Sequence, residues 1–154
     1  MKFTAKHDLE APVEGVFARC SDFAAIERAA LERGVEVTRR SVLTQPGAQL
    51  GWDVRVKLRG RARDLQVELV GCDAPDSVIY VIEGAGVRSE VVTEFVSLAR
   101  NRTRIHVAID TRPKTMGGRL LIQSLKLAKG SLNRKLKKRL SDFGLRLEEE
   151  VEQV

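Results

Sequence analysis

The sequence is poor in the residues from which metal sites and catalytic triads are built. It has two cysteines, Cys20 and Cys72, and two histidines, His7 and His106. The cysteines form no Cys-x-x-Cys pair, so we expect reduced thiols rather than a disulfide framework or a zinc site. The G-x-S-x-G, G-x-x-x-x-G-K-[S/T] and H-E-x-x-H motifs are also missing. We therefore predict no metal site, no cofactor and no catalytic residues.

Long apolar runs are missing as well. No stretch approaches the roughly 20 apolar residues of a membrane-spanning helix, and residues 1–8 carry charge without an apolar signal core. With 154 residues, 43% of them hydrophobic, the chain is long enough for one globular domain with its own core. We expect a single domain over residues 1–154, located in the cytoplasm.

Hydrophobic periodicity divides the chain into strands and helices. Alternation over residues 3–9 predicts a strand, and helical spacing over residues 12–34 predicts two short helices with a break at Ser21 and Asp22. Turn sequences rich in Gly, Pro, Asn and Asp separate further predicted strands at 35–43, 50–58, 61–70, 78–83, 87–98 and 102–111. Connections this short join antiparallel neighbours.

The chain ends in one long amphipathic helix, predicted over residues 115–151. Its apolar side chains recur every three or four positions, at Leu121, Leu125, Ala128, Leu132, Leu136, Leu140, Phe143, Leu147 and Val151. Such a face needs a sheet to cover, and space left under a curved sheet would form a pocket. A straight helix of this length would span roughly 55 Å at about 1.5 Å per residue. Because that exceeds the width of such a domain, we expect either a kink at Gly130 or a protruding helix end.

The order of elements and several short segments resemble one known family. A strand leads into a helix pair through LEAPVEGVFARCSDF, the second strand of the meander opens with GAQLGW, and KTMGGRLLIQSLKLAKGSL starts the closing helix. In these features, which span essentially the whole chain, the sequence resembles the START-like (SRPBCC) superfamily, and within it the bacterial polyketide cyclase/dehydrase and lipid-transport group.

This resemblance implies an α+β helix-grip fold. A seven-stranded curved antiparallel sheet would wrap a long C-terminal helix, with two short helices between the first two strands. The family's apolar cavity lies between the sheet and that helix, where different members carry lipids, hormones or quinones, or cyclise polyketides. Because members share a container more than a reaction, the resemblance does not choose among these activities.

Strand alternation predicts which side chains would line such a cavity. Trp52 shares its strand face with apolar residues, whereas Asp53 and Arg55 lie on the opposite face, so the Trp52 face should point inward. The same argument, extended to the other strands and the last helix, gives His7, Trp52, Val54, Val56, Leu65, Val67, Tyr80, Val91, Thr93, Phe95, Val107, Leu121, Ser124, Leu125 and Ala128. The alternative is that these side chains fill a solid core, because protein interiors are close-packed.

His7 is the sharpest polar candidate in this set. It lies between Ala5 and Leu9 on the inward face of the first strand, where an imidazole could bind or protonate a ligand. The alternative is a core histidine bonded to a backbone carbonyl. Tyr80 and Thr93 could supply hydroxyl groups that orient a ligand.

Positive charge gathers on the last helix. Lys and Arg number 27 against 21 Asp and Glu, a net charge of +6, and cations crowd at Arg134, Lys135, Lys137, Lys138 and Arg139. This cluster favours contact with an anionic membrane surface. No aromatic residues interleave the cations, which argues against nucleic acid. The alternative is a solvated helix face.

Three hypotheses of function follow from the sequence. The first is binding or transport of a small hydrophobic ligand, such as a lipid, a polyketide or a quinone-like molecule. The second is a cyclase or dehydratase-type enzyme that uses the same cavity, although no catalytic constellation is recognisable. The third is an interaction module that binds an anionic surface through the basic helix. Val92 and Val96, on an outward strand face, also raise the hypothesis of a homodimer.

Overall fold

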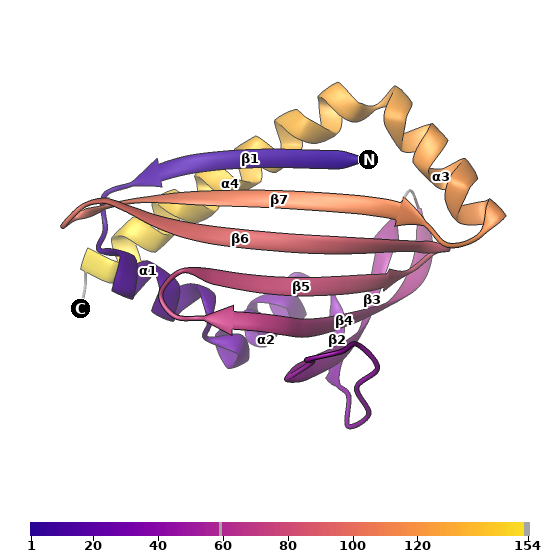
Figure 1. The fold of residues 1–154 in the computed structure, drawn as a ribbon, viewed down its shortest axis with the longest axis horizontal. Helices are drawn as coiled ribbons and strands as arrows, with labels where there is room; N and C mark the ends of the chain where they lie inside the picture. Colours follow the sequence, from indigo (N-terminus) through magenta and orange to yellow (C-terminus); the bar gives the residue numbers. More distant parts are fainter. Residues whose placement is uncertain (59, 153–154) are drawn as a thin grey trace.

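Seven strands form one antiparallel sheet in the computed structural model, which describes residues 1–58 and 60–152 (Figure 1). The strands are β1 (Lys2–Leu9), β2 (Glu36–Arg39), β3 (Leu50–Leu58), β4 (Arg61–Asp73), β5 (Ser77–Gly84), β6 (Val87–Ala99) and β7 (Arg102–Pro113). Their order across the sheet is β1-β7-β6-β5-β4-β3-β2, so the first strand pairs with the last. The predicted α+β helix-grip architecture is confirmed.

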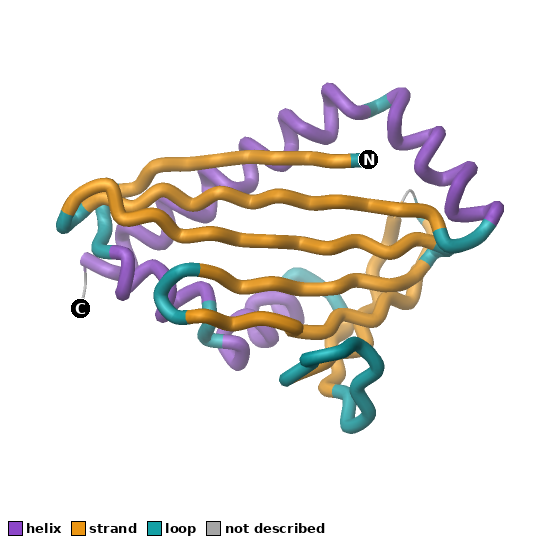
Figure 2. The backbone as a smooth tube through the Cα atoms, in the orientation of Figure 1, coloured by secondary structure: helices purple, strands orange, loops and turns teal. Residues whose placement is uncertain are grey.

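The helices of the described chain are α1 (Val13–Cys20), α2 (Phe23–Glu32), α3 (Met116–Leu127) and α4 (Lys129–Glu152). The first two connect the opposite edges of the sheet, as Figure 2 shows. The predicted break between them is present: Ser21 ends α1, and the Asp22 carboxylate accepts a hydrogen bond of 3.2 Å from the Ala25 N–H at the start of α2.

The second strand is shorter than the predicted 35–43, because β2 ends at Arg39 and residues 40–49 fold over the outer face of the sheet. Glu68, buried on that face, accepts hydrogen bonds of 2.7 Å from both the backbone N–H and the hydroxyl of Thr44. Arg40 lies 3.8 Å from the same carboxylate. The carboxylate satisfies backbone groups that a longer strand would have paired, so the loop is held by Glu68.

The C-terminal segment forms two helices, whereas we expected one. The chain bends at Ala128, two residues before Gly130, where we considered a kink. The Ala128 N–H donates a hydrogen bond of 3.0 Å to the Leu125 carbonyl. α3 begins against the turn between β5 and β6, where Gly118 lies so close to the Gly86 carbonyl that no side chain fits. α4 packs along β1 instead (Figure 1). The bend lets both ends of the segment contact the sheet.

The main core lies between the inner face of the sheet, α1 and α4. Its most buried side chains include Leu9 on β1, Val16 on α1, Ile105 on β7 and Leu147 on α4. α4 follows the β1 edge, whereas α2 contacts β2 at the other edge. The two helices therefore cover the opposite edges of the same inner face and leave its middle strands uncovered between them.

Candidate ligand cavity

A cavity of about 530 Å³ lies between the inner face of the sheet, α2 and α4. Every strand from β2 to β7 contributes to its wall, and the side chains are almost all apolar or aromatic. Two of its residues, Ile26 on α2 and Phe143 on α4, are 44% and 38% exposed. Because these large apolar side chains line the cavity and also meet solvent, they mark its opening between α2 and α4.

Many of the sheet residues predicted from strand alternation lie in this wall. They are Trp52, Val54, Val67, Tyr80, Val91, Thr93, Phe95 and Val107. Trp52 is at the centre of an aromatic group, with its ring centroid 5.9 Å from that of Phe23 and 6.3 Å from that of Tyr80. The Trp52 face of the sheet is therefore the cavity face.

The remaining predicted residues are not among the side chains that line this cavity. They are His7, Val56, Leu65, Leu121, Ser124, Leu125 and Ala128. Leu121, Ser124 and Leu125 belong to α3, which the bend at Ala128 directs toward the β7 end and the turn after β5. The C-terminal residues that do reach the cavity are Leu140 and Phe143 of α4.

The side chain of His7, a residue of β1, lies between this strand and α4. Its half-buried ring contacts the α4 backbone at Gly144, and its buried Nε2 has no hydrogen-bond partner in the described part of the chain. The hydrogen bond to a backbone carbonyl that the sequence suggested as the alternative is therefore not made by Nε2. His7 takes part in the contact between the edge strand and the helix.

Among the described residues that line the cavity, Glu27 of α2 is the one with a charged side chain. Its Oε1 accepts hydrogen bonds from the Trp52 indole N–H at 2.8 Å and from Arg39 Nε at 2.6 Å. These bonds, first that from Trp52 and then that from Arg39, lower the pKa of the carboxyl group below its ordinary value. Glu27 is therefore an ionised carboxylate at neutral pH, fixed in place by two donors.

The other titratable groups of the wall stay neutral. Burial raises the pKa of the Cys20 thiol to about 12 and moves the pKa of the Tyr80 phenol upward as well. Both groups therefore keep their protons at physiological pH. Together with the Thr93 hydroxyl, they are weakly polar points on a wall that is otherwise apolar.

The contribution of α2 to the cavity was not predicted from the sequence. Phe23, Ile26, Glu27 and Ala30 all line the cavity, at positions i, i+3, i+4 and i+7 of one helix face. The apolar members of this face are visible in the sequence, and Glu27 is the one acid among them. A charged residue inside an apolar helix stripe is the signal that could have identified it.

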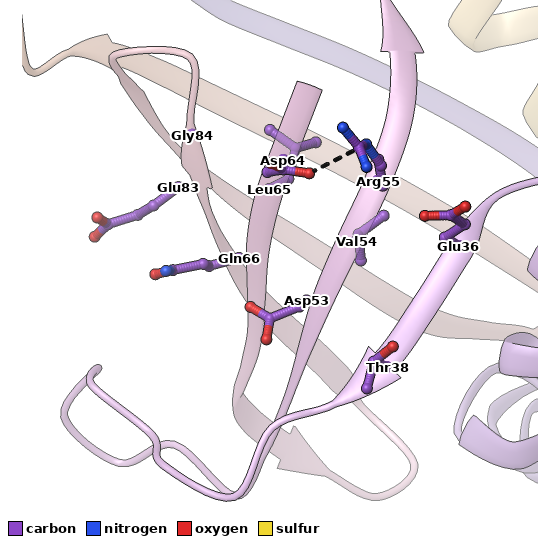
Figure 3. A pocket seen from close by; sticks show the side chains of 10 residues that line it. All are labelled: Glu36, Thr38, Asp53, Val54, Arg55, Asp64, Leu65, Gln66, Glu83 and Gly84. Carbon is purple, nitrogen blue, oxygen red and sulfur yellow. Dashed lines mark ion pairs between the residues drawn. The ribbon is translucent and has the colours of Figure 1, made fainter. Parts of the chain in front are cut away.

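A second hollow, of about 610 Å³, lies on the opposite face of β2 to β5 (Figure 3). Its side chains are mainly charged or polar, including Glu36, Asp53, Asp64 and Glu83. Arg55 pairs with Asp64 at 3.6 Å, and both side chains are mostly exposed. This hollow is a solvated surface feature, so the apolar cavity is the better candidate for a ligand site.

No family model matches the sequence, and the search of curated proteins found none that is significantly similar. Solved structures do match. A START superfamily protein from Mycobacterium smegmatis is 15% identical over 91% of this chain and 99% of its own, with a TM-score of 0.54. The Zhui aromatase/cyclase from Streptomyces sp. R1128 is 13% identical over 76% and 70%, with a TM-score of 0.57.

A third similar structure is a point mutant of norcoclaurine synthase from Thalictrum flavum, in complex with a transition-state analogue. It is 11% identical over 95% of this chain and 94% of its own, with a TM-score of 0.65. At these identities the similarity establishes the fold alone. The chain therefore has a START-like helix-grip fold, as its sequence predicted.

Two features are absent from the described part of the chain, a cluster of metal ligands and a membrane-spanning helix. Residues 1–58 and 60–152 contain no group of three or more His, Cys, Asp or Glu side chains arranged to hold a metal ion. No helix within the same ranges combines the length and apolar character that crossing a bilayer requires.

Proposed function

We propose that this protein binds or carries a small hydrophobic molecule in the cavity between α2, α4 and the sheet. The observation that carries the proposal is the cavity wall: about 530 Å³ of space faces an almost wholly apolar surface with few polar groups. Ligand sites of this kind typically measure roughly 300–1,000 Å³. Burial of the ligand's apolar surface would supply affinity, and the few polar groups would supply orientation.

The protonation states favour binding over a cyclase-type reaction. Proton transfer at neutral pH needs groups whose pKa lies near 7. Glu27 has a lowered pKa, whereas those of Cys20 and Tyr80 are raised, so none of the three is poised to exchange a proton. Binding or transport of a ligand therefore agrees better with this cavity wall than a cyclase-type reaction does.

The first experiment is native mass spectrometry of the protein purified from its own cells, followed by solvent extraction of any bound molecule. We expect a stoichiometric apolar ligand. Val67→Phe, which places a phenyl ring at a cavity position, should lose most of it. Val96→Phe is the matched control, because Val96 is 46% exposed on β6 and does not line the cavity. Equal ligand content in both variants and the wild type would contradict the proposal.

A specific observation supports a second function, contact with an anionic membrane. One face of α3 presents Met116, Leu120 and Leu127 to solvent, with exposures of 72%, 63% and 92%. Arg119 and Lys126 are exposed beside them, and the basic cluster of Arg134, Lys135, Lys137, Lys138 and Arg139 follows on α4. An apolar helix face flanked by cations is typical of helices that lie in the bilayer interface.

Vesicle sedimentation tests this second function. We expect binding to vesicles that contain phosphatidylglycerol, weaker binding to pure phosphatidylcholine, and loss of binding for the double variant Leu120→Ser/Leu127→Ser. Leu31→Ser is the control, since Leu31 is 56% exposed on α2, away from this face. Binding that disappears fully in high salt would assign the contact to the basic cluster alone. No binding to either vesicle would rule out the membrane function.

A further inference from the structure

The cavity wall carries a carboxylate of which only one oxygen takes part in hydrogen bonds with the described residues. Glu27 directs both of its bonds, from Trp52 and from Arg39, to the same atom, Oε1. Within the described residues, its other oxygen, Oε2, has no hydrogen bond. A carboxylate with one fixed oxygen and one open oxygen is a prearranged acceptor for a ligand donor.

The position of Glu27 orients such a ligand. Its side chain is 25% exposed and its partner Arg39 is 52% exposed, so this carboxylate is close to solvent. Trp52, Tyr80 and Val67 form the apolar wall beyond it. A ligand would therefore keep its polar end near Glu27 and place its apolar body against the aromatic group.

The neighbouring charge selects the type of donor. Arg39 already pairs with the carboxylate, with 2.6 Å between Arg39 Nε and Glu27 Oε1. A ligand ammonium group would therefore be repelled by the guanidinium and would find no unpaired negative charge to compensate for this. A ligand carboxylate has no proton to give at neutral pH and would face Glu27 with like charge. A neutral hydroxyl group supplies the donor without either penalty.

We infer that the cavity prefers neutral hydrophobic molecules that carry a hydroxyl group, bound to Oε2 of Glu27, over carboxylates, amines and unsubstituted hydrocarbons of the same shape. This inference rests on the proposed ligand-binding function and narrows its ligand class. It also makes Glu27 a specificity-determining residue of the cavity.

The test is isothermal titration at pH 7 with a matched set of naphthalene, 2-naphthol, 2-naphthoate and 2-(aminomethyl)naphthalene. We expect 2-naphthol to bind at least about tenfold more tightly than naphthalene, as a hydrogen bond to a charged group allows, with the two charged compounds weaker than 2-naphthol. Equal affinities of naphthalene and 2-naphthol would overturn the inference and leave the binding function intact. No heat from any of the four compounds at two well-separated temperatures would overturn both, because the enthalpy of apolar binding changes with temperature.

Glu27→Gln sharpens the test, because the amide oxygen can keep the bonds from Trp52 and Arg39 while an NH₂ donor replaces Oε2. We expect this variant to lose the preference for 2-naphthol and to gain affinity for 2-naphthoate. Glu32→Gln, an exposed acid at the end of the same helix, should behave as the wild type. A Glu27→Gln variant that keeps the hydroxyl preference would contradict the role of Glu27. The wild-type series decides the preference by itself if Glu27→Gln melts early.

Discussion

Gly144 of α4 lies directly against the imidazole of His7 in β1. A methyl group at position 144 would fall 2.8 Å from His7 Nε2 and closer still to Cδ2, well inside van der Waals contact. The absence of a side chain on the helix thus determines how closely α4 approaches the edge strand. The contact between His7 and Gly144 therefore holds α4 close to β1, at one edge of the sheet.

Gly144→Ala should therefore destabilise the protein, although alanine favours a helix more than glycine does. We expect a loss of about 1–3 kcal/mol, the usual cost of overpacking, measured as the urea midpoint. Gly130→Ala in the same helix is the control, because its nearest neighbour would be the Arg134 side chain at 3.6 Å. That variant should be unchanged or gain up to about 1 kcal/mol. Equal effects of the two substitutions would mean that α4 can shift away from His7 freely.

The two C-terminal helices should respond differently to truncation of a leucine. Leu147 on α4 is 1% exposed, whereas Leu127 at the end of α3 is 92% exposed. Leu147→Ala should cost about 2–5 kcal/mol, and Leu127→Ala less than about 0.5 kcal/mol, both measured by urea denaturation. Similar costs would show that residue 127 is buried and that the segment does not bend at Ala128.

Glu68 should make stability depend on pH in the acid range. Burial alone would raise its pKa, but hydrogen bonds from the Thr44 hydroxyl and from the backbone N–H groups of Thr44 and Gln45, with the charge of Arg40, lower it overall. Its contribution is complete above the pKa of an unfolded glutamate, about 4.3, and is lost as the pH falls through the lower pKa of the folded state.

Urea midpoints measured from pH 7 down to pH 3 check this expectation. Glu68→Gln should be less stable than the wild type at pH 7 and should lose less stability on acidification. Glu90→Gln, at an exposed position of β6, should follow the wild-type curve. If the urea midpoints of Glu68→Gln and of the wild type fall in parallel with pH, the ionisation of Glu68 does not cause the loss of stability in acid.

Cys20 should react slowly with maleimides. With a pKa of about 12, only about one thiol in 10⁴ is ionised at pH 8, compared with roughly a quarter for an ordinary cysteine. In a Cys72→Ala background, the labelling rate should rise about tenfold per pH unit from pH 8 to pH 10, as followed by mass spectrometry. A rate that levels off below pH 9 would show that the thiol is not shielded by the cavity wall.

Element order was the part of the fold that the sequence determined well, because each strand carries its own alternation and each turn its own chemistry. The short β2 was not predictable in the same way. The loop from Arg40 depends on Glu68, 24 residues beyond Thr44, and no local pattern reports a hydrogen bond of that kind. The bend at Ala128 has a similar origin, since the apolar stripe continues through it and only the contacts at Gly86 and β1 require two helix directions.

For the cavity, alternation identified the sheet side and failed to identify the helix side. Strand alternation assigns Trp52 and Val67 to one face of the sheet even when the helix that packs on that face is unknown, because successive strand residues point to opposite faces. Which helix covers that face is a tertiary question. Glu27 became a candidate only when its bond to Trp52 showed that α2 closes the cavity.

The pairing of β1 with β7 has a consequence for the order in which the protein forms. Lys2 lies opposite Asp110 and Leu9 opposite Thr103, so β1 is synthesised about a hundred residues before its partner β7. The hairpins from β3 to β7 need only their immediate neighbours and can assemble as the chain leaves the ribosome. β1 must wait unpaired until β7 appears, and α4 can dock on it only afterwards. We expect β1 to be among the last of the seven strands to fold, and the α4 side of the cavity to close only after β1 has paired with β7.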